Sequence, residues 1–465
     1  MAETRTPDPA DFRSQPASLD QRGYRKWLYV AIVGGRWRML RTGLALILIA
    51  FYLALPFLTV DGKPFLRLDL GAKRAVIAGQ TFLPQDLSYL VPLVLIALVG
   101  TLLMVSLVGR FFCGWLCPHN VFLEMVFRPL ERLIEGPAHR AARRDQDGQG
   151  ADHLLRKMAK YGLYVLIAGA LANTMTAVFI GTQGFRYGLI VDPVTHPSAL
   201  LCFATFFALM LFDFAWFREQ TCTLLCPYGR FQSVMLDPHS RIVAYDPRRG
   251  EPRGKPSDPA SGACVDCRQC ITVCPTGIDI RNGSQLECLH CTACIDACDQ
   301  VMDRLDRPRG LIAYRSEREL AGKPGQLIRP RTALYALVLL ALGTVAFWRI
   351  AGRSDLLITL LRSGTLPVTV HDGQGHEQIR QLVPLSLINR TGRERVIELS
   401  LPAGLGASIS LPQPRIALAA YGRVELTPVI DVPRQLFTQD RLDTVLTFTS
   451  DGDAPVAQLL TLRTP

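Results

Sequence analysis

Apolar residues are concentrated in five blocks along the chain, each close to the length that a bilayer requires. An α-helix needs about 20 apolar residues to cross the hydrocarbon core of a membrane. Four of the blocks contain no charged residue, and the remaining one contains only Asp213, close to its end. The pattern predicts five transmembrane helices, at Thr42–Val60, Leu87–Gly109, Tyr161–Gly181, Ser198–Phe217 and Thr332–Trp348. A further apolar stretch, Trp27–Gly35, is too short to cross a bilayer.

The hydrophobic pattern changes after the fifth block. Segments such as QLVPLSLINRTG and RVIELSLP alternate apolar and polar residues, and Gly, Pro, Asn and Asp separate them at short intervals. Several short strands with this spacing predict an immunoglobulin-like β-sandwich. Residues 351–465 contain no cysteine, so the disulfide of antibody domains is absent and the prediction concerns the architecture alone.

The charge of +11 indicates which loops lie in the cytoplasm. Residues 351–465 hold 11 Arg and 11 Asp or Glu, so the whole excess lies before them. Nucleic-acid binding is the usual explanation of a basic protein, but Lys and Arg beside membrane helices explain this distribution better. The loop 110–160 has nine basic residues, whereas the loop 182–197 has one. The asymmetry predicts a cytoplasmic N-terminus and a periplasmic C-terminal part.

We therefore predict a multi-pass protein of the bacterial inner membrane. The opening residues lack the apolar core of a cleavable signal peptide, so membrane helices must export the C-terminal part. The predicted parts are a cytoplasmic segment with four helices (1–217), a cytoplasmic region (218–331), a fifth helix (332–350) and a periplasmic β-sandwich (351–465).

Residues 264–299 contain two C-x2-C-x2-C-x3-C runs, which are typical of ferredoxins with two [4Fe–4S] clusters. Three thiolates of such a cluster come from one run and the fourth comes from the other run. One cluster is expected on Cys264, Cys267, Cys270 and Cys298, and the other on Cys288, Cys291, Cys294 and Cys274. Two four-cysteine zinc sites are the alternative, but zinc sites use separated C-x2-C pairs. The ferredoxin-like part spans about 255–305, and Asp299 replaces the proline expected after its last cysteine.

Two C-x3-C-P pairs follow the second and fourth predicted helices, in RFFCGWLCPHN and REQTCTLLCPYGRFQ. Each pair places two thiols at i and i+4 on one helix face, before a proline that weakens or ends the helix. Both pairs are expected at the cytoplasmic face, where the clusters also lie. Four thiolates at one face favour Cu(I) as the bound metal. Zinc or another Fe–S centre is a less distinctive alternative for the same ligands. The candidate copper-binding and catalytic residues are Cys113, Cys117, Cys222 and Cys226; simple packing of small buried residues is the alternative.

Three neighbouring residues are weaker candidates. His119 is a possible further ligand, Asp213 is either a functional group in the membrane or an interfacial charge, and Cys202 is expected to be a packing residue. The predicted helices contain no histidine, which argues against a pair of haems across the bilayer. The sequence also has no glycine-rich run that would indicate a nucleotide or flavin site.

The order of these motifs resembles a known family over nearly the full chain. The segments GGRWRMLR, FCGWLCP, REQTCTLLCPYGRFQS, CPTGIDIRNGSQLEC, CIDACDQVM and GLIAYRS resemble the FixG/RdxA/CcoG type of cytochrome c oxidase accessory protein. The resemblance implies a role in assembly of the cbb3-type oxidase, through reduction of Cu(II) to Cu(I) for its catalytic subunit. It also implies that the C-x3-C-P cysteines belong to the copper chemistry.

Two further functions are compatible with the sequence. One is an electron-relay subunit that exchanges electrons with quinol, similar to NapH-type proteins, although no histidine for a quinone is evident in the predicted helices. The other is a non-enzymatic scaffold for oxidase assembly. We expect oxidase subunits or copper-handling assembly factors, an unidentified cytoplasmic electron donor and the bilayer as partners, and no nucleic acid. The oligomeric state, including a homo-oligomer, stays open.

Overall fold

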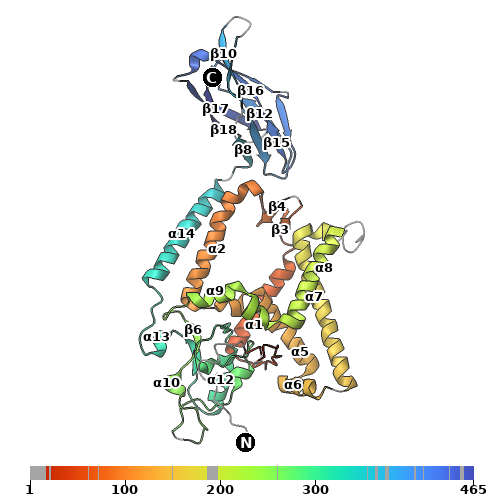
Figure 1. Ribbon diagram of the computed structural model, residues 1–465, viewed down its shortest axis with the longest axis vertical. Coiled ribbons are helices and arrows are strands. Elements are labelled where there is room, and N and C mark those ends of the chain that lie inside the picture. Colours follow the sequence, from red (N-terminus) through yellow and green to blue (C-terminus); the bar gives the residue numbers. More distant parts are fainter. Residues whose placement is uncertain are drawn as a thin grey trace. The chain divides into compact units, whose positions relative to one another are not determined.

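The computed structural model describes the chain from residue 17 onward in two compact units, Met1–Ala346 and Phe347–Pro465 (Figure 1). Within this range, residues 20, 21, 61, 72, 149, 186–196, 259, 353, 362–364, 372–375, 403, 404, 412, 439 and 451–454 are not described.

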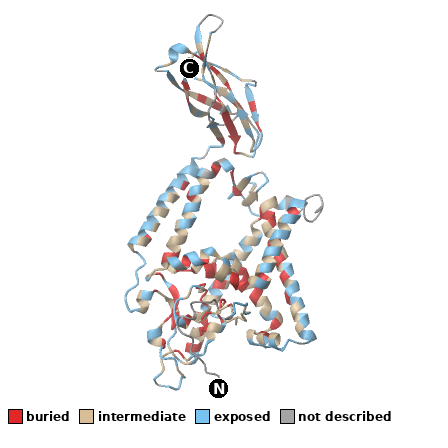
Figure 2. Cartoon of the chain, in the orientation of Figure 1, coloured by how far each residue is buried: buried red, intermediate tan, exposed pale blue. Residues whose placement is uncertain are grey.

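The five predicted membrane helices are confirmed. They are α1 (Arg36–Ala54), α2 (Leu87–Val108), α7 (Ala151–Phe185), α8 (Pro197–Phe212) and α14 (Pro330–Ala351). A π-helical turn, η5 (Asp213–Phe217), continues α8 to the predicted end of the fourth helix. In the most apolar stretches of α1, α2, α8 and α14, between 6% and 17% of the residues are buried within the protein. Most residues of these helices are therefore half-buried or exposed (Figure 2), as expected for contact with lipid.

The first helix begins six residues before the predicted Thr42–Val60 and ends earlier. Its first turn is polar, but it is held by another segment: the N–H groups of Trp37 and Arg38 donate to the carboxylate of Asp296, at 3.1 and 2.7 Å. A carboxylate at a helix N-terminus satisfies free N–H groups and favours the helix dipole. After α1 the chain forms β1 (Thr59–Val60), β2 (Lys63–Pro64), β3 (Leu66–Asp69), β4 (Arg74–Ile77), β5 (Gln80–Phe82) and the turn η2 (Pro84–Asp86).

Short elements connect the long helices at one end of the first unit. Between α2 and α7 lie α3 (Phe111–Trp115), α4 (Pro118–Phe122), η3 (Leu123–Phe127), α5 (Arg128–Glu135) and α6 (Ala138–Asp147). Between α8 and α14 lie η6 (Thr221–Leu225), α9 (Pro227–Met235), β6 (Ile242–Tyr245), α10 (Pro247–Gly250), α11 (Gln269–Thr272), η7 (Ile280–Asn282), α12 (Ala293–Arg304), β7 (Ile312–Arg315) and α13 (Glu317–Leu320). Buried residues gather where these elements meet the helix ends (Figure 2), and Trp37 of α1 packs directly against the core of the ferredoxin segment.

The predicted all-β C-terminal region is also confirmed. Its strands are β8 (Leu356–Leu360), β9 (Val368–His371), β10 (Glu377–Leu382), β11 (Leu385–Asn389), β12 (Arg395–Ser400), β13 (Ser408–Ser410), β14 (Arg415–Leu418), β15 (Arg423–Leu426), β16 (Val429–Pro433), β17 (Arg441–Ser450) and β18 (Val456–Arg463), with the turn η8 (Arg434–Leu436) after β16. The order β14-β12-β17-β18 forms one antiparallel layer. The orders β15-β11-β8 and β13-β16-β10-β9 form the second layer. Pro384 and Pro428 lie between its two halves, where residues without an N–H interrupt the ladder. Leu387 and Phe448 belong to the core between the layers.

Candidate functional site

Two cavities in the ferredoxin segment are lined by cysteines of both runs. The first cluster cavity is lined by Cys264, Cys267, Cys270 and Cys298. The second cluster cavity is lined by Cys274, Cys288, Cys291 and Cys294, and also by Cys270. A [4Fe–4S] cube takes four thiolates, three from one run and one from the other. Each cavity gathers such a set of four thiols from both runs, so the residues fit this cofactor.

The loops that carry these cysteines adopt the same unusual backbone. Asp266 and Arg268 flank the second cysteine of the first run with φ angles of 49° and 55°. His290 and Thr292 flank the second cysteine of the other run with φ angles of 52° and 64°. Residues other than glycine rarely adopt positive φ and do so mainly where the surroundings impose it. The repeated conformation curls each loop so that its thiols turn toward one cavity.

The second cysteine run has Asp299 at the position where the first run has Pro275. Helix α11 ends at Thr272, before Cys274 and Pro275, whereas α12 continues through Cys298 to Arg304. The Asp299 carboxylate accepts the N–H of Gly310 at 2.9 Å. A proline would remove an N–H from the middle of α12, so the departure from the ferredoxin pattern lengthens the helix that carries two of the cysteines.

Burial changes the acidity of the cavity thiols. It raises the pKa of Cys270, Cys288 and Cys298 to about 12. At neutral pH such thiols keep their protons unless a metal displaces them, because the metal ligand is the thiolate. Burial disfavours the negative charge of a thiolate at these cysteines, and the positive charge of a bound metal would stabilise it.

The two C-x3-C-P pairs differ in shape from the predicted continuous helix. Cys113 lies in α3, but Cys117 is the N-cap of α4, and Pro118 is the first residue of α4. In the second pair Cys222 lies in the π-helical turn η6, and Cys226 is the N-cap of α9. The prolines therefore begin new helices, at a position where the missing N–H has no intrahelical partner to lose.

The backbones of the two pairs repeat each other closely. The N–H of Cys117 donates to Phe112 at 2.9 Å, and the N–H of Cys226 donates to Thr221 at 2.8 Å, both to the carbonyl five residues earlier. Gly109 and Arg218, each four residues before the first cysteine of a pair, have φ angles of 61° and 50°. The same sharp turn thus follows α2 and η5, and it directs both pairs toward the same place.

Cys113, Cys117, Cys222 and Cys226 come together as a four-cysteine site. Cys113 and Cys222 pack in one apolar cluster. The electrostatic neighbours of Cys222 are the other three thiols of the site and Arg110. The Cys113 Sγ also donates to the Oε1 of the buried Gln232 at 3.1 Å. Burial raises the pKa of Cys113, Cys117 and Cys222, so these thiols are also protonated at neutral pH when no metal is bound.

The four-cysteine site lies directly against the second cluster cavity. Cys113 forms a buried cluster with Leu289 and Cys291 of the cavity loop. A Cβ on Gly114 would lie 2.5 Å from the Leu289 oxygen and 3.0 Å from the Cys291 Cα, so only glycine permits this approach. The sequence predicted that pairs and clusters share one membrane face, and the structure places them in van der Waals contact.

Arg110 lies between the two sites and was not recognised from the sequence. It is 2% exposed, and among the described residues it forms no ion pair with a carboxylate. Its backbone N–H donates to His290 Nδ1 at 2.9 Å, and its guanidinium donates to the Leu286 carbonyl. Its charge acts on Cys113 on one side and on Cys288 on the other. A buried cation needs a compensating anion, and thiolates that bind metal would provide it.

The cavity loop is fixed by the end of α2 through His290. Burial and the charge of Arg110 lower the pKa of His290 to about 3, so its imidazole is neutral. The carbonyl of His290 accepts the indole N–H of Trp115 at 3.3 Å and the hydroxyl of Tyr314 at 3.0 Å. Residues beside a membrane helix thus hold the loop that carries two cysteines of the second cluster cavity.

His119 and Asp213, considered separately in the sequence, form a pair beside the four-cysteine site. His119 Nδ1 is 2.7 Å from Asp213 Oδ2, and the other Asp213 oxygen accepts the hydroxyl of Thr221. His119 Nε2 is buried and has no hydrogen-bond partner among the described residues. A carboxylate that fixes one ring nitrogen while the other stays free is the arrangement of metal-ligating histidines.

Cys202 lies apart from these sites. It is half-buried in α8 and interacts with Thr176 of α7. In the part of the chain that the structure describes, no three His, Cys, Asp or Glu side chains are close enough to hold a single metal ion.

Comparisons with known proteins agree with this architecture. A model of a 4Fe-4S dicluster domain matches residues 217–317, and a model of a 4Fe-4S binding domain matches residues 90–137. RdxA of Cereibacter sphaeroides is 34% identical to this chain over 398 residues, which are 82% of this chain and 83% of RdxA. The chain belongs to the RdxA/FixG family. The nitrogen fixation protein FixG of Rhizobium meliloti is also 34% identical, over 62% of this chain and 57% of FixG.

This RdxA/FixG-family protein is thus a membrane-associated 4Fe–4S electron-transfer protein. A more distant relative, the ferredoxin-type protein NapH of Escherichia coli, is 24% identical over 221 residues, 44% of this chain and 66% of NapH. The match to residues 90–137 covers α2 and the first C-x3-C-P pair, but none of the ferredoxin cysteines.

Proposed function

We propose that this protein reduces Cu(II) to Cu(I) at the four-cysteine site and thereby supplies copper for assembly of a cbb3-type cytochrome c oxidase. The observation that supports this function best is the contact of Cys113 and Gly114 with the loop of the second cluster cavity. Electrons that arrive at this loop are therefore already next to the four thiols. Thiolates prefer Cu(I) to Cu(II), so the site stabilises the product of the reduction.

The proposed cluster ligands follow the two cavities. Cys264, Cys267, Cys270 and Cys298 would hold one [4Fe–4S] cluster, and Cys274, Cys288, Cys291 and Cys294 the other. When bound, such clusters store and release single electrons. Arg110 places positive charge between the two sites, which favours negative charge on either side of it. The hydrogen bond from the Arg110 backbone N–H to His290 keeps the loop of the second cluster cavity at a fixed separation from the four-cysteine site.

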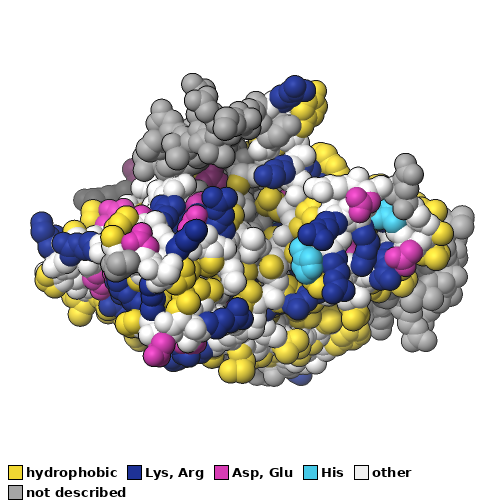
Figure 3. Space-filling model, turned by 90° about the horizontal axis from the view of Figure 1, so that it is seen from below, with side chains coloured by type: hydrophobic (Ala, Val, Ile, Leu, Met, Phe, Trp, Pro, Cys, Tyr) yellow, Lys and Arg dark blue, Asp and Glu magenta, His cyan; other side chains and the backbone are white. Residues whose placement is uncertain are grey.

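The proposed orientation puts the ferredoxin segment in the cytoplasm and the β unit in the periplasm. Lys and Arg side chains spread over the end of the first unit that carries the ferredoxin segment (Figure 3), in line with the excess of basic residues on cytoplasmic loops. The β unit would then meet oxidase subunits or copper-handling assembly factors outside. A cytoplasmic or membrane donor must supply the electrons.

Paired substitutions test the copper site. Cys113→Ala/Cys117→Ala and Cys222→Ala/Cys226→Ala should lower Cu(I) retention about equally, and combining them should add little, since residues that act as one unit are non-additive. Purified, cluster-loaded protein is reduced without oxygen, Cu(II) is added, and Cu(I) is measured together with cluster reoxidation. Cys202→Ala is the matched control and should behave as the wild type. Full copper retention in both pair variants would leave the thiols as packing residues.

A second function is favoured by one comparison. The 4Fe-4S binding domain model covers Cys113 and Cys117 and no other cysteine, so a cluster there needs two more thiols, which the second pair provides. The protein would then be an electron relay with a further Fe–S centre. Iron analysis separates the two functions: pair variants of a copper site keep about eight iron atoms per chain, and pair variants of an Fe–S relay lose about four.

A further inference from the structure

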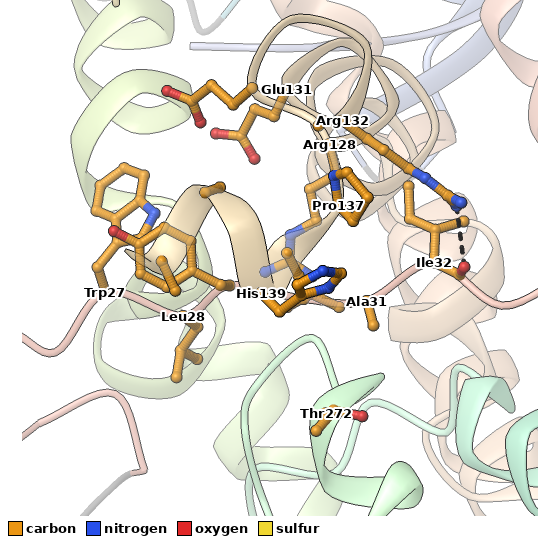
Figure 4. Close-up of a pocket in the computed structure, with 17 residues that line it drawn as sticks. Trp27, Leu28, Ala31, Ile32, Arg128, Glu131, Arg132, Pro137, His139 and Thr272 are labelled. Atoms are coloured by element: carbon orange, nitrogen blue, oxygen red, sulfur yellow. Dashed lines mark hydrogen bonds between the residues drawn. The ribbon is translucent and has the colours of Figure 1, made fainter. Parts of the chain in front are cut away.

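A cavity of about 430 Å³ lies beside the ferredoxin segment, outside both cluster cavities and the four-cysteine site. It is bounded by the segment 27–32, by α5, by the start of α6 and by Thr272 of α11 (Figure 4). Its volume is in the range typical of sites for small organic ligands. The segment 27–32 belongs to the apolar stretch that is too short to cross the membrane.

The charged groups around the cavity are already paired with protein. The Glu131 carboxylate accepts Arg218 Nη1 and Nη2 at 2.6 and 2.9 Å. Arg132 donates to the Ile32 carbonyl at 3.0 Å, which is the contact drawn in Figure 4. Glu135 pairs with Lys160 at 2.7 Å. A charged ligand would find few unpaired partners here, which argues against a nucleotide or a phosphate.

The rest of the lining is mostly apolar and aromatic, and comes from the segment 27–32 and from the start of α6. Thr272 is polar, but its hydroxyl donates to the Gln269 carbonyl at 3.0 Å. The guanidinium groups of Arg25 and Arg218 lie 4.4 and 4.7 Å from the Trp27 ring and hold it in place. His139 also lines the cavity; it is exposed and forms no hydrogen bond with a described residue. The lining suits a planar apolar ligand that exchanges a proton.

The cavity adjoins the cluster loops through the backbone. The N–H of Ala31 donates to the Thr272 carbonyl at 2.8 Å, and Thr272 lies midway between Cys270 and Cys274. Arg128 of α5 donates to the carbonyl of Pro275, the residue after Cys274, at 2.9 Å. A redox ligand in the cavity is therefore separated from the cluster cysteines by one layer of protein.

Exposed apolar side chains lie close to the wall of the cavity. The Arg156 side chain of α7 donates to the Ile134 carbonyl of α5 at 2.6 Å and joins the wall to the third membrane helix. Leu133 of α5 and Leu154, Leu155 and Met158 of α7 are exposed close to this joint. Exposed apolar side chains beside the cavity suit a membrane-soluble carrier better than a water-soluble one.

We propose that this cavity binds the head group of a membrane quinol and is the point where electrons enter. One quinol loses two electrons and two protons and becomes a quinone, while two oxidised clusters each take up one electron. His139 accepts the protons in turn and releases them to solvent. This inference rests on the proposed function because the clusters must pass the electrons on. The sequence argued against a quinol relay because the helices lack histidine, whereas His139 lies outside them.

The test uses full-length, cluster-loaded protein in detergent with decylubiquinone and decylubiquinol as probes. Ala142→Trp fills the cavity, and Gln146→Trp adds the same side chain to an exposed position of the same helix. The wild type and Gln146→Trp should bind decylubiquinone saturably, and Ala142→Trp should bind about tenfold more weakly or worse. His139→Ala should keep the binding but reduce its clusters with decylubiquinol on the order of 100-fold more slowly.

Equal binding by Ala142→Trp and Gln146→Trp, or no saturable binding by the wild type, would overturn the proposal. Dithionite reduces the clusters without using the cavity. Experiments on dithionite-reduced protein therefore test the copper function separately from quinol binding. Dithionite-reduced Ala142→Trp should still convert Cu(II) to Cu(I) at the wild-type rate, and a slower rate would mean that the cavity is not merely an entry point. Failure of dithionite-reduced wild type to reduce Cu(II) would contradict the copper function while the binding measurement still stands for the cavity.

Discussion

His119 and Asp213 are 94 residues apart in the chain, yet their side chains meet beside the four-cysteine site. If His119 Nε2 is a copper ligand, His119→Ala should weaken Cu(I) binding, and Asp213→Asn should do so by about 10- to 100-fold through the misplaced ring. Competition with a Cu(I) chelator measures both. His153→Ala, in a second His–Asp pair whose atoms lie 3.7 Å apart, is the control. Unchanged copper affinity in His119→Ala would show that the pair only packs helices together.

Single residues differ in how far the sequence reveals them. The cysteines stand out because thiols are rare and their spacing reflects the geometry of the cofactor. The pairing of His119 with Asp213 depends on where α4 and η5 meet, and no local pattern encodes that. Arg110 could have been suspected, since it directly precedes a cysteine motif at the end of a membrane helix. That it has no carboxylate partner among the described residues is visible only in three dimensions.

Among the elements, α1 and α12 are joined by the Asp296 carboxylate at the N-terminus of α1. Asp296→Asn should lower the free energy of unfolding by about 1–2 kcal/mol, because two N–H groups lose a charged acceptor. Asp303→Asn on the same helix should lower the stability much less, since its ion pair with Arg309 is exposed. Thermal unfolding of the cluster-loaded protein compares them. Equal shifts would mean that Asp296 does not anchor α1.

The same contact explains why hydropathy placed the first helix too late. Arg36, Arg38 and Arg41 make the start of α1 look like a loop, but they belong to a helix whose first turn is held by Asp296 and whose Arg41 is buried. Arg41 Nε donates to the Gly114 carbonyl at 2.7 Å. The stretch Trp27–Gly35 shows the converse: its pattern reveals that it is apolar and too short to cross a bilayer, but does not reveal that part of it lines a cavity. Length and hydropathy define helix cores well and their protein-bound ends poorly.

For the whole molecule, the decisive prediction concerns sidedness. A reporter fused after Asp303 should show a cytoplasmic location and one fused after Pro465 a periplasmic location, because basic residues dominate the loops on the ferredoxin side. Green fluorescent protein and alkaline phosphatase give opposite signals in the two compartments. Cytoplasmic signals at both positions would mean that α14 does not cross the membrane and would remove the periplasmic role of the β unit.

The broad plan of the molecule was accessible from the sequence because each part has its own period of apolar residues. Long uninterrupted blocks gave the helices, and alternation gave the β unit. The division of one β layer at Pro384 and Pro428 was not foreseen, although prolines at strand ends are a recognisable signal. The contact of the second cluster cavity with the four-cysteine site lies beyond periodicity, because it joins segments about 175 residues apart, such as Trp115 and His290.

The hydrogen bonds by which Asp296 and His290 attach the ferredoxin segment to the first two membrane helices also have a consequence for biosynthesis. The ribosome makes the ferredoxin segment after the fourth membrane helix and before the fifth, so Trp37 and Arg110, which contact this segment from the first two helices, are synthesised before it. We therefore expect iron to be loaded onto a chain that is already tethered to the membrane. A cell short of iron would accumulate chains whose first two helices lack their fixed ends. Such chains would be natural targets of membrane proteases, so cofactor supply would set the amount of the protein.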